Sequence, residues 1–303
     1  MAIDILLVGS VAYDSVETPS GKVTKALGGS ATYAAIAASY FAVPGIVAVV
    51  GRDFGPGHIN LLKRRGIDLH GLQIDNSGNT FFWAGHYEGD MNRAHTRETH
   101  LNVFERFDPV IPPSYRKAPY VLLGNIHPAL QLRVLDQVQK PKLVFCDTMN
   151  YWIESEPRLL AEVFKRVHVV CINEDEAYQF CRTSSLVKAA EQLIALGPRH
   201  IIIKKGIHGV VMFGRNSFFS LPAIPLRQVK DPTGAGDSFA GGTLGRLAQA
   251  RSVSDTSFRR ALVAGTVMAS YCVEDFSCRK TIKLTKRDID GRSRQIRAYT
   301  RIP

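Results

Sequence analysis

Short runs of Val, Ile and Leu recur along the chain, and they are continuous rather than alternating with polar residues. Such runs are typical of strands buried on both faces of a parallel sheet. Segments with apolar residues at helical spacing lie between them, which predicts an α/β fold with a mostly parallel central sheet. The predicted strands are IDILLVG (3–9), IVAVVG (46–51), YVLLGN (120–125), KLVFCD (142–147), HVVCIN (168–173) and HIIIKKG (200–206), and the clearest predicted helices are 30–41, 156–167 and 185–197.

Polar or flexible residues follow several of these predicted strands. In open parallel sheets, ligands bind beyond the carboxyl ends of the strands. The sequence therefore predicts a ligand site along one rim of the sheet. The residues that end the runs are Gly9, Gly51, Asn125, Asp147, Asn173 and Gly206.

Two stretches do not fit the alternation of strands and helices. Residues 11–25 and 80–100 combine β-type residues, turns and mixed charge. Long excursions from a compact domain often act as lids. We expect one domain over 1–303, in which these two segments form a small β-rich lid whose tip lies around 89–92.

Composition agrees with one globular domain. The 303 residues are 45% hydrophobic and 21% charged, and no apolar run approaches the ~18–20 residues that span a bilayer. The N-terminal segment predicts a first strand rather than a signal peptide. The five cysteines show no CxxC spacing, which favours free thiols and a cytoplasmic location, with Cys146 and Cys171 as small core residues.

The net charge of +11 is concentrated near the C-terminus. Residues 279–303 hold nine Lys or Arg and two Asp, which is +7 of the +11. A basic final helix is most often a solvated face, so we expect neither a nucleic acid nor a membrane as partner.

The stretch TGAGDSFAGG (233–242) predicts a glycine-rich loop that opens a helix. Gly234 and Gly236 let backbone N–H groups turn inward, and the helix N-terminus adds about half a positive charge, which together suit a phosphate. Asp237 then lies at the start of the helix, where it is placed to accept a proton from a hydroxyl that attacks phosphorus. The alternative is an ordinary aspartate cap after a glycine turn.

DPTGAGDSFAGG (231–242) resembles the C-terminal signature of the ribokinase-like, or PfkB, family of carbohydrate and nucleoside kinases. Other segments resemble family elements in the expected order, and the resemblance covers essentially the whole chain. It implies a ribokinase-like three-layer sandwich that uses ATP and Mg²⁺. The matching segments are VGSVAYD (8–14), GGSATYAAIAAS (28–39), VVGRDFG (49–55) and NEDEA (173–177).

The resemblance implies roles for individual residues. Asp237 would be the base, and Gly234, Ala235 and Gly236 would hold the developing phosphate charge. Mg²⁺ would be organised by Asn173 and Glu176, which also form a capping-box pair at a helix start. Substrate contacts are expected from Asp14, Gly28, Gly29, Tyr33, Asp53 and Asn125, and nucleotide contacts from Lys204, Gly206, Gly209 and Thr233.

Several of these assignments have an alternative. Tyr33 would stack on a substrate ring or pack in the core, and Asp53 would face the pocket or hold a turn. Lys204 would meet a phosphate or be a solvated strand-end lysine. Asp231 would shape the loop or position a cation, and we assign it no catalytic role.

The GGSATY segment (28–33) departs from the lysine- and asparagine-containing element of ribokinase itself. We therefore expect a small-molecule kinase acting on a sugar or cyclitol, ahead of a nucleoside. A non-catalytic ligand-binding protein on the kinase fold is the other alternative. The resemblance also implies a homodimer through the lid.

Overall fold

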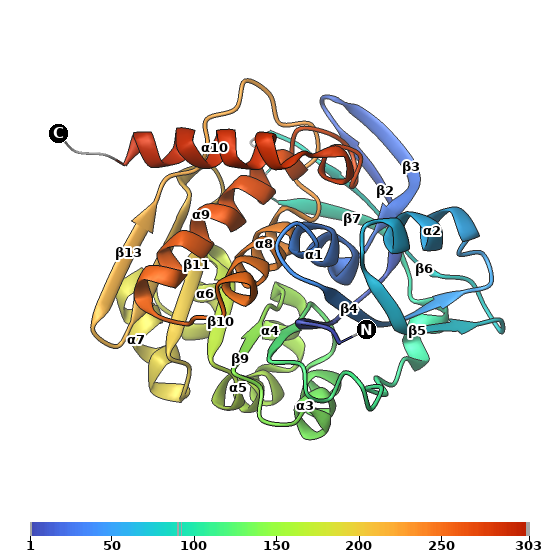
Figure 1. The fold of residues 1–303 in the computed structure, drawn as a ribbon, viewed down its shortest axis with the longest axis horizontal. Coiled ribbons are helices and arrows are strands. Elements are labelled where there is room, and N and C mark those ends of the chain that lie inside the picture. Colours follow the sequence, from blue (N-terminus) through green and yellow to red (C-terminus); the bar gives the residue numbers. More distant parts are fainter. Residues whose placement is uncertain (1, 90, 92, 301–303) are drawn as a thin grey trace.

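A nine-stranded sheet forms the centre of the protein (Figure 1), and its seven strands from β11 to β5 in the sheet order run parallel. The computed structural model describes residues 2–89, 91 and 93–300. The order β13-β12-β11-β10-β9-β8-β1-β4-β5 joins strands β13 (Ser217–Leu221), β12 (Val210–Gly214), β11 (His200–Lys204), β10 (Val169–Asn173), β9 (Leu143–Cys146), β8 (Tyr120–Leu123), β1 (Ile5–Val8), β4 (Pro44–Gly51) and β5 (Asp68–Asp75). All six strands predicted from the apolar runs are present, with shifted boundaries.

Helices cover both faces of this sheet and make three layers. One hydrophobic cluster lies between the sheet and α1 (Ser30–Ala38), α2 (Pro56–Arg64), α8 (Ala235–Ala250), α9 (Asp255–Cys272) and α10 (Lys286–Tyr299). A second cluster lies between the opposite face and α3 (Pro128–Gln137), α4 (Asn150–Ser155), α5 (Pro157–Arg166), α6 (Glu174–Cys181) and α7 (Leu186–Leu196). Short 3-10 turns occur at Asn102–Arg106, Gly206–His208 and Thr281–Lys283.

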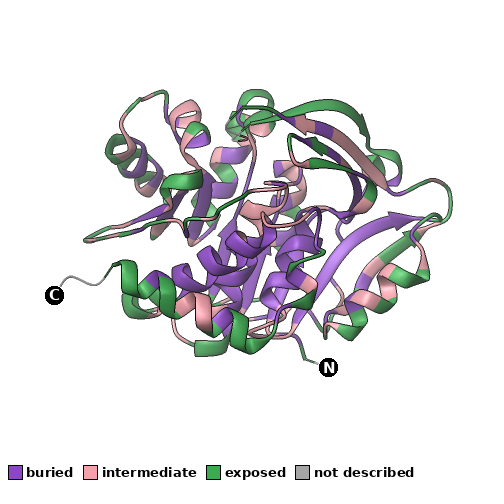
Figure 2. Cartoon of the chain, turned by 90° about the horizontal axis from the view of Figure 1, so that it is seen from above, coloured by how far each residue is buried: buried purple, intermediate pink, exposed green. Residues whose placement is uncertain are grey.

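The alternation of side chains along the strands divides the core between these layers. On β1, Ile5 and Leu7 point into the first cluster, while Leu6 and Val8 point into the second. Both sets are buried, which is why the run shows no polar alternation. Cys146 and Cys171 are free thiols in this core, as predicted. Figure 2 shows the buried interior enclosed by exposed outer surfaces of the helices.

A second, four-stranded sheet stands beside one edge of the main layers (Figure 1). Its order is β3-β2-β6-β7, with bounds β3 (Gly21–Gly28), β2 (Ala12–Thr18), β6 (Phe81–Tyr87) and β7 (Ala94–His100). The β2–β6 pair is parallel and the two outer pairs are antiparallel. The two segments that broke the sequence pattern thus form one sheet; the predicted tip includes positions 90 and 92, which lie outside the described residues.

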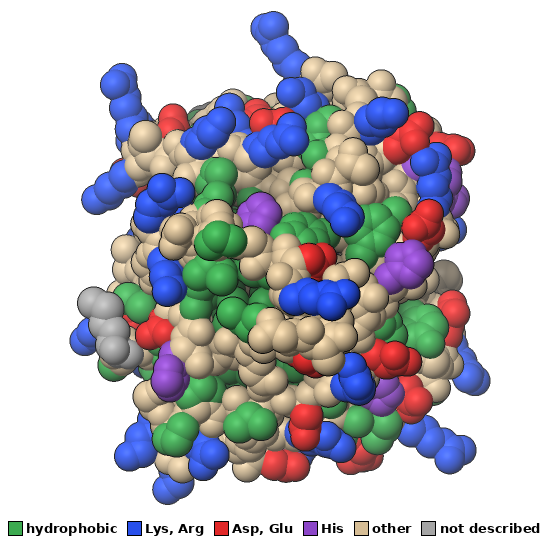
Figure 3. Space-filling view, turned by 90° about the vertical axis from the view of Figure 1, so that its right-hand side faces the viewer, with side chains coloured by type: hydrophobic (Ala, Val, Ile, Leu, Met, Phe, Trp, Pro, Cys, Tyr) green, Lys and Arg blue, Asp and Glu red, His purple; other side chains and the backbone are tan. Residues whose placement is uncertain are grey.

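Acidic, basic and histidine side chains are interspersed on the side of the molecule that carries the small sheet (Figure 3). The strongest concentration of basic sequence lies instead in the C-terminal region, which includes helix α10. None of the helices among the described residues has the length and apolar character needed to cross a bilayer.

Candidate active site

The glycine loop before α8 adopts a backbone that only glycine enters readily. Gly234 has φ of +75° and caps the helix, and a Cβ at this position would collide with the ring of Tyr33. At Gly236 a Cβ would come 3.1 Å from Nζ of Lys204. The loop therefore presents bare backbone, a helix N-terminus and a nearby ammonium group to one small space, an arrangement that suits an anion.

Asp231 holds this loop in place from below. Asp231 is only 1% exposed. One carboxylate oxygen accepts the Thr233 N–H at 2.9 Å, and the other accepts the Ser277 N–H at 3.1 Å. Both contacts are to backbone amides, so Asp231 shapes the loop, as one of its two sequence-based alternatives proposed.

Asp237 lies in the first turn of α8, beside the glycine loop. Burial, reinforced by the negative charge of Asp147 and opposed by the positive charge of Lys204, raises the pKa of Asp237 to about 7. A carboxyl group with a pKa near neutrality is matched to accepting a proton at physiological pH.

Lys204 is paired with Asp147 rather than solvated. Its ammonium group lies 3.0 Å from both carboxylate oxygens of Asp147, and the two side chains are only 18% and 7% exposed. The attraction of Asp147 outweighs burial and raises the pKa of Lys204, so the lysine stays charged. The sequence placed Asp147 on the rim but gave no signal for this pair, because Asp147 follows strand β9 and Lys204 ends strand β11, 57 positions further along the chain.

Asp14 is a further buried carboxylate in the same region. It is 5% exposed, and burial, followed by repulsion from Asp231, raises its pKa to about 7. A Cβ at Gly28 would fall on the Asp14 carboxylate, and Gly29 caps α1 with φ of +93°. The glycine pair thus makes room for the carboxylate and turns the chain into the helix.

Asn173 and Glu176 form a complete capping box at the start of α6, which confirms that part of the prediction. Each side chain accepts the other residue's backbone N–H at 2.8 Å. Glu176 is buried, which raises the pKa of its carboxyl group. The pair lies at the carboxyl end of β10, beside the strand that ends in Lys204.

The remaining predicted residues take varied positions. Tyr33 is 2% exposed and packs under Gly234, so the structure favours the core alternative over stacking on a substrate. Asp53 accepts both the N–H and the hydroxyl of Thr80 at 2.7 Å, which is a turn role. The side-chain amide oxygen of Asn125 accepts the Trp152 indole N–H at 2.9 Å.

The predicted nucleotide contacts lie on two different loops. Gly206 and Gly209 both have positive φ and form the turn between β11 and β12. Thr233 belongs to the glycine loop, and its hydroxyl donates to the hydroxyl oxygen of Tyr87 at 3.2 Å. Tyr87 lies on β6, so this contact ties the small sheet to the loop; nothing in the sequence singled it out.

The fold and this site define the class of protein. Residues 2–284 match the model of the pfkB family carbohydrate kinases, and the chain belongs to that family. Both the family and the ribokinase-like fold inferred from the sequence are therefore confirmed.

The individual relatives are named for, or bound to, different substrates. The chain is 29% identical over 261 residues to a cytidine kinase of Thermococcus kodakarensis, covering 84% of this chain and 91% of the relative. A nucleoside kinase of Burkholderia thailandensis in complex with inosine superposes with a TM-score of 0.78 at 18% identity, covering 99% and 100% of the two chains. Arabidopsis thaliana ribokinase complexed with ribose and ATP superposes with a TM-score of 0.76 at 18% identity. The match covers 97% of this chain and 99% of the ribokinase chain.

Proposed function

We propose that this protein is an ATP-dependent nucleoside kinase. The observation that carries the proposal is Asp237, a carboxylate with a pKa near 7 in the first turn of a helix behind a glycine loop that suits a phosphate. A nucleoside replaces the sugar or cyclitol favoured from sequence, because the cytidine kinase matches 84% of this chain at 29% identity.

Asp14 supplies the contact expected for the sugar part of such a substrate. One carboxylate accepts hydrogen bonds from two neighbouring hydroxyl groups, which a ribose ring offers. Gly28 leaves room for that carboxylate, because a Cβ at this position would fall on it. The raised pKa of Asp14 reflects burial and repulsion from Asp231, and hydroxyl donors would stabilise its charged form.

The residues present also fit ATP and Mg²⁺. A Cβ at Gly236 would come 3.1 Å from Nζ of Lys204, so the glycine leaves backbone and an ammonium group free to meet a phosphate. Asn173 and Glu176 are oxygen donors of the kind that Mg²⁺ takes, mostly through waters, and both lie at the rim near Lys204. Bound Mg²⁺ neutralises phosphate charge.

In the transfer step, Asp237 accepts the proton of the substrate hydroxyl as its oxygen bonds to the γ-phosphorus. The bond between that phosphorus and the bridging oxygen to the β-phosphate breaks, and ADP leaves. The backbone N–H groups of the glycine loop stabilise the charge that develops on the transferred group. The small sheet acts as a lid that excludes water, and it is the surface through which we propose a homodimer forms.

The test is a panel of nucleosides, sugars and cyclitols with ATP and Mg²⁺, assayed with the wild type and Asp237→Asn. We expect a nucleoside to give the highest kcat/KM, and the substitution to lower kcat on the order of 10²–10⁴-fold. Circular dichroism and ATP binding serve as controls for folding. If no acceptor is phosphorylated, or if Asp237→Asn turns over as the wild type does, the proposal fails.

A further inference from the structure

A surface cavity of about 440 Å³, open to solvent, lies outside the candidate active site, between the loop that follows β13, residues 274–280 and helix α10. One side is formed by Ile224, Pro225 and Leu226. The other residues that line it are polar or charged, namely Arg227, Gln228, Glu274, Lys280, Arg292 and Gln295. Its volume falls in the range of small-molecule sites.

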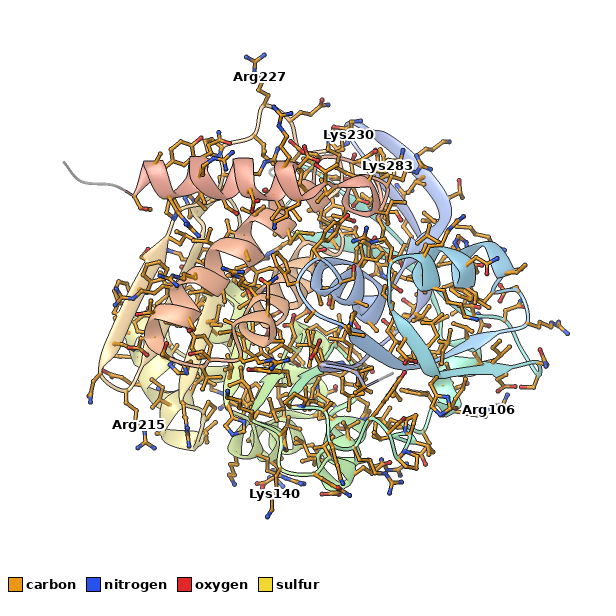
Figure 4. The ribbon with its side chains drawn as sticks, in the orientation of Figure 1. Arg106, Lys140, Arg215, Arg227, Lys230 and Lys283 are labelled. Atoms are coloured by element: carbon orange, nitrogen blue, oxygen red, sulfur yellow. The ribbon has the colours of Figure 1, made fainter. Side chains whose placement is uncertain are left out.

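The charged groups of the cavity favour an anion. Arg227, Lys280 and Arg292 bring three positive charges against the one negative charge of Glu274, which pairs with Arg292 at 3.0 Å. Among the described residues, Arg227 and Lys280 form no ion pair within the chain. Figure 4 shows Arg227, Lys230 and Lys283 on the same side of the molecule as α10, whereas Arg215 and Lys140 lie far from it.

Arg292 is held in place before any ligand arrives. Its guanidinium donates to the Ser270 hydroxyl at 3.1 Å and to Glu274 at 3.0 Å, and it lies 3.5 Å from the centre of the Tyr271 ring. A fixed guanidinium loses little freedom when it binds a phosphate. The cavity therefore combines one positioned cation with two exposed ones at its rim.

Two of the three segments that line the cavity also hold the glycine loop. Residues 224–228 run directly into Asp231, and residues 274–280 include Ser277, whose N–H binds the Asp231 carboxylate. Gln228, which lines the cavity, donates to the Ser20 hydroxyl of the small sheet at 3.3 Å. A ligand that draws these segments together would act on the loop before Asp237.

We propose that this cavity binds a small phosphorylated organic molecule of the nucleotide class, separately from the active site, and that its occupancy alters the catalytic rate. The phosphate contacts Lys280, Arg227 and Arg292, and the organic part packs on Ile224 and Leu226. The inference adds a second site to the proposed function, but its binding test does not depend on turnover.

The binding test uses calorimetry with ADP on the full chain, compared with inorganic phosphate alone. We expect two ADP sites in the wild type and one in the double variant Arg227→Ala/Lys280→Ala, in which the second site weakens on the order of 10-fold or more for each cation removed. If phosphate binds this site more weakly than ADP does, the result would support a contact between the organic part of ADP and the apolar side of the cavity. Equal binding of the two would overturn the organic part of the proposal.

Arg215→Ala/Lys188→Ala is the matched control, because it removes the same two residue types from exposed positions away from the cavity: Arg215 lies beyond β12 (Figure 4) and Lys188 lies on α7 (Figure 1). We expect this control to keep both ADP sites. A wild type with one ADP site, or a cavity variant with both sites intact, would overturn the inference and leave the kinase proposal standing. Two ADP sites without any phosphoryl transfer would instead support the cavity and remove the kinase function.

A rate measurement tests the second half of the inference. With nucleoside and ATP fixed, we expect added ADP to change the rate of the wild type beyond simple competition with ATP, and the cavity variant to show competition alone. Identical ADP inhibition patterns in the two proteins would show that occupancy of the cavity has no effect on catalysis.

Discussion

The glycine loop and the outer edge of the small sheet are held by opposite kinds of contact. The loop rests on Asp231, which is 1% exposed, and on the largely buried Lys204–Asp147 pair. Strand β7 is exposed along its whole length. Arg93, which immediately precedes β7, pairs with Asp175, and their side chains are 76% and 64% exposed. Buried contacts of the first kind are costly to break, whereas exposed ion pairs contribute about 0–1 kcal/mol.

This difference suits a phosphoryl-transfer site. The parts that stabilise charge must be in place before reaction, because moving them during the step would cost energy. In the proposed mechanism the small sheet admits substrate and excludes water, and contacts that exchange readily with water would let it open and close. The Arg93–Asp175 pair joins the two parts, since Asp175 lies between Asn173 and Glu176.

The largest effect is expected from breaking the ion pair under the loop. Lys204→Met leaves Asp147 buried without its cation, and we expect the free energy of unfolding to fall by about 3–5 kcal/mol. Urea denaturation at pH 7 measures this loss. Lys188→Met, at an exposed position of α7, is the control and should change stability by less than about 0.5 kcal/mol. A similar small change at Lys204 would show that the pair does not support the loop.

The next effect separates backbone strain from steric conflict in the glycine loop. Gly234→Ala places a Cβ on the Tyr33 ring at φ of +75°, and we expect kcat to fall on the order of 10²–10³-fold because the anion site is displaced. Gly66→Ala is a close control, since Gly66 has φ of +73° and open space around it. Steady-state kinetics of both variants decide the matter, and an equal loss in the two would assign the effect to strain alone.

A smaller effect is expected from pH. The Asp237 pKa of about 7 means that the base is protonated in acid, so kcat/KM should rise about tenfold per pH unit (1.4 kcal/mol) below 7 and level off above it. Because Asp14 also has a pKa of about 7, the slope is steeper where both groups titrate. A rate that is flat between pH 5 and 8 would contradict this assignment.

The same raised pKa values affect stability in the opposite direction. Between the ordinary aspartate pKa near 4 and the folded-state value of about 7, the folded protein binds more protons than the unfolded chain. The free energy of unfolding contributed by these two groups is therefore largest in acid and decreases as pH rises to 7. Asp237→Asn should flatten this decrease, which thermal unfolding across the pH range would reveal.

The smallest effect on stability is expected at the edge of the small sheet. Arg93→Ala should lower the free energy of unfolding by no more than about 1 kcal/mol, because the pair with Asp175 is exposed. If the pair helps the lid close, the ratio of ATP hydrolysis to phosphoryl transfer should rise in the same variant. Arg97→Ala, which breaks the exposed pair with Glu17 within the small sheet, is the control. An unchanged ratio in Arg93→Ala would remove this pair from lid closure.

The sequence predicted the layers of the fold well and the contacts of the site less well. Buried strands can be predicted from sequence because both of their faces are apolar. The glycine loop can be predicted because the positive φ at 234 and the close approach of the Tyr33 ring require glycine there. The role of Tyr33 was ambiguous, because an aromatic residue on a helix shows the same sequence spacing whether it packs in the core or contacts a ligand. The Lys204–Asp147 and Thr233–Tyr87 contacts join residues 57 and 146 positions apart, and only the fold brings them together.

The capping box at Asn173 and Glu176 restricts how this protein can change over evolutionary time. If the same two side chains start α6 and organise Mg²⁺, most exchanges at position 176 would damage folding and catalysis in one step. Glutamine alone keeps a cap-forming oxygen while removing the charge. At position 176, glutamine is therefore the one exchange that would give an inactive but well-folded relative of an active kinase.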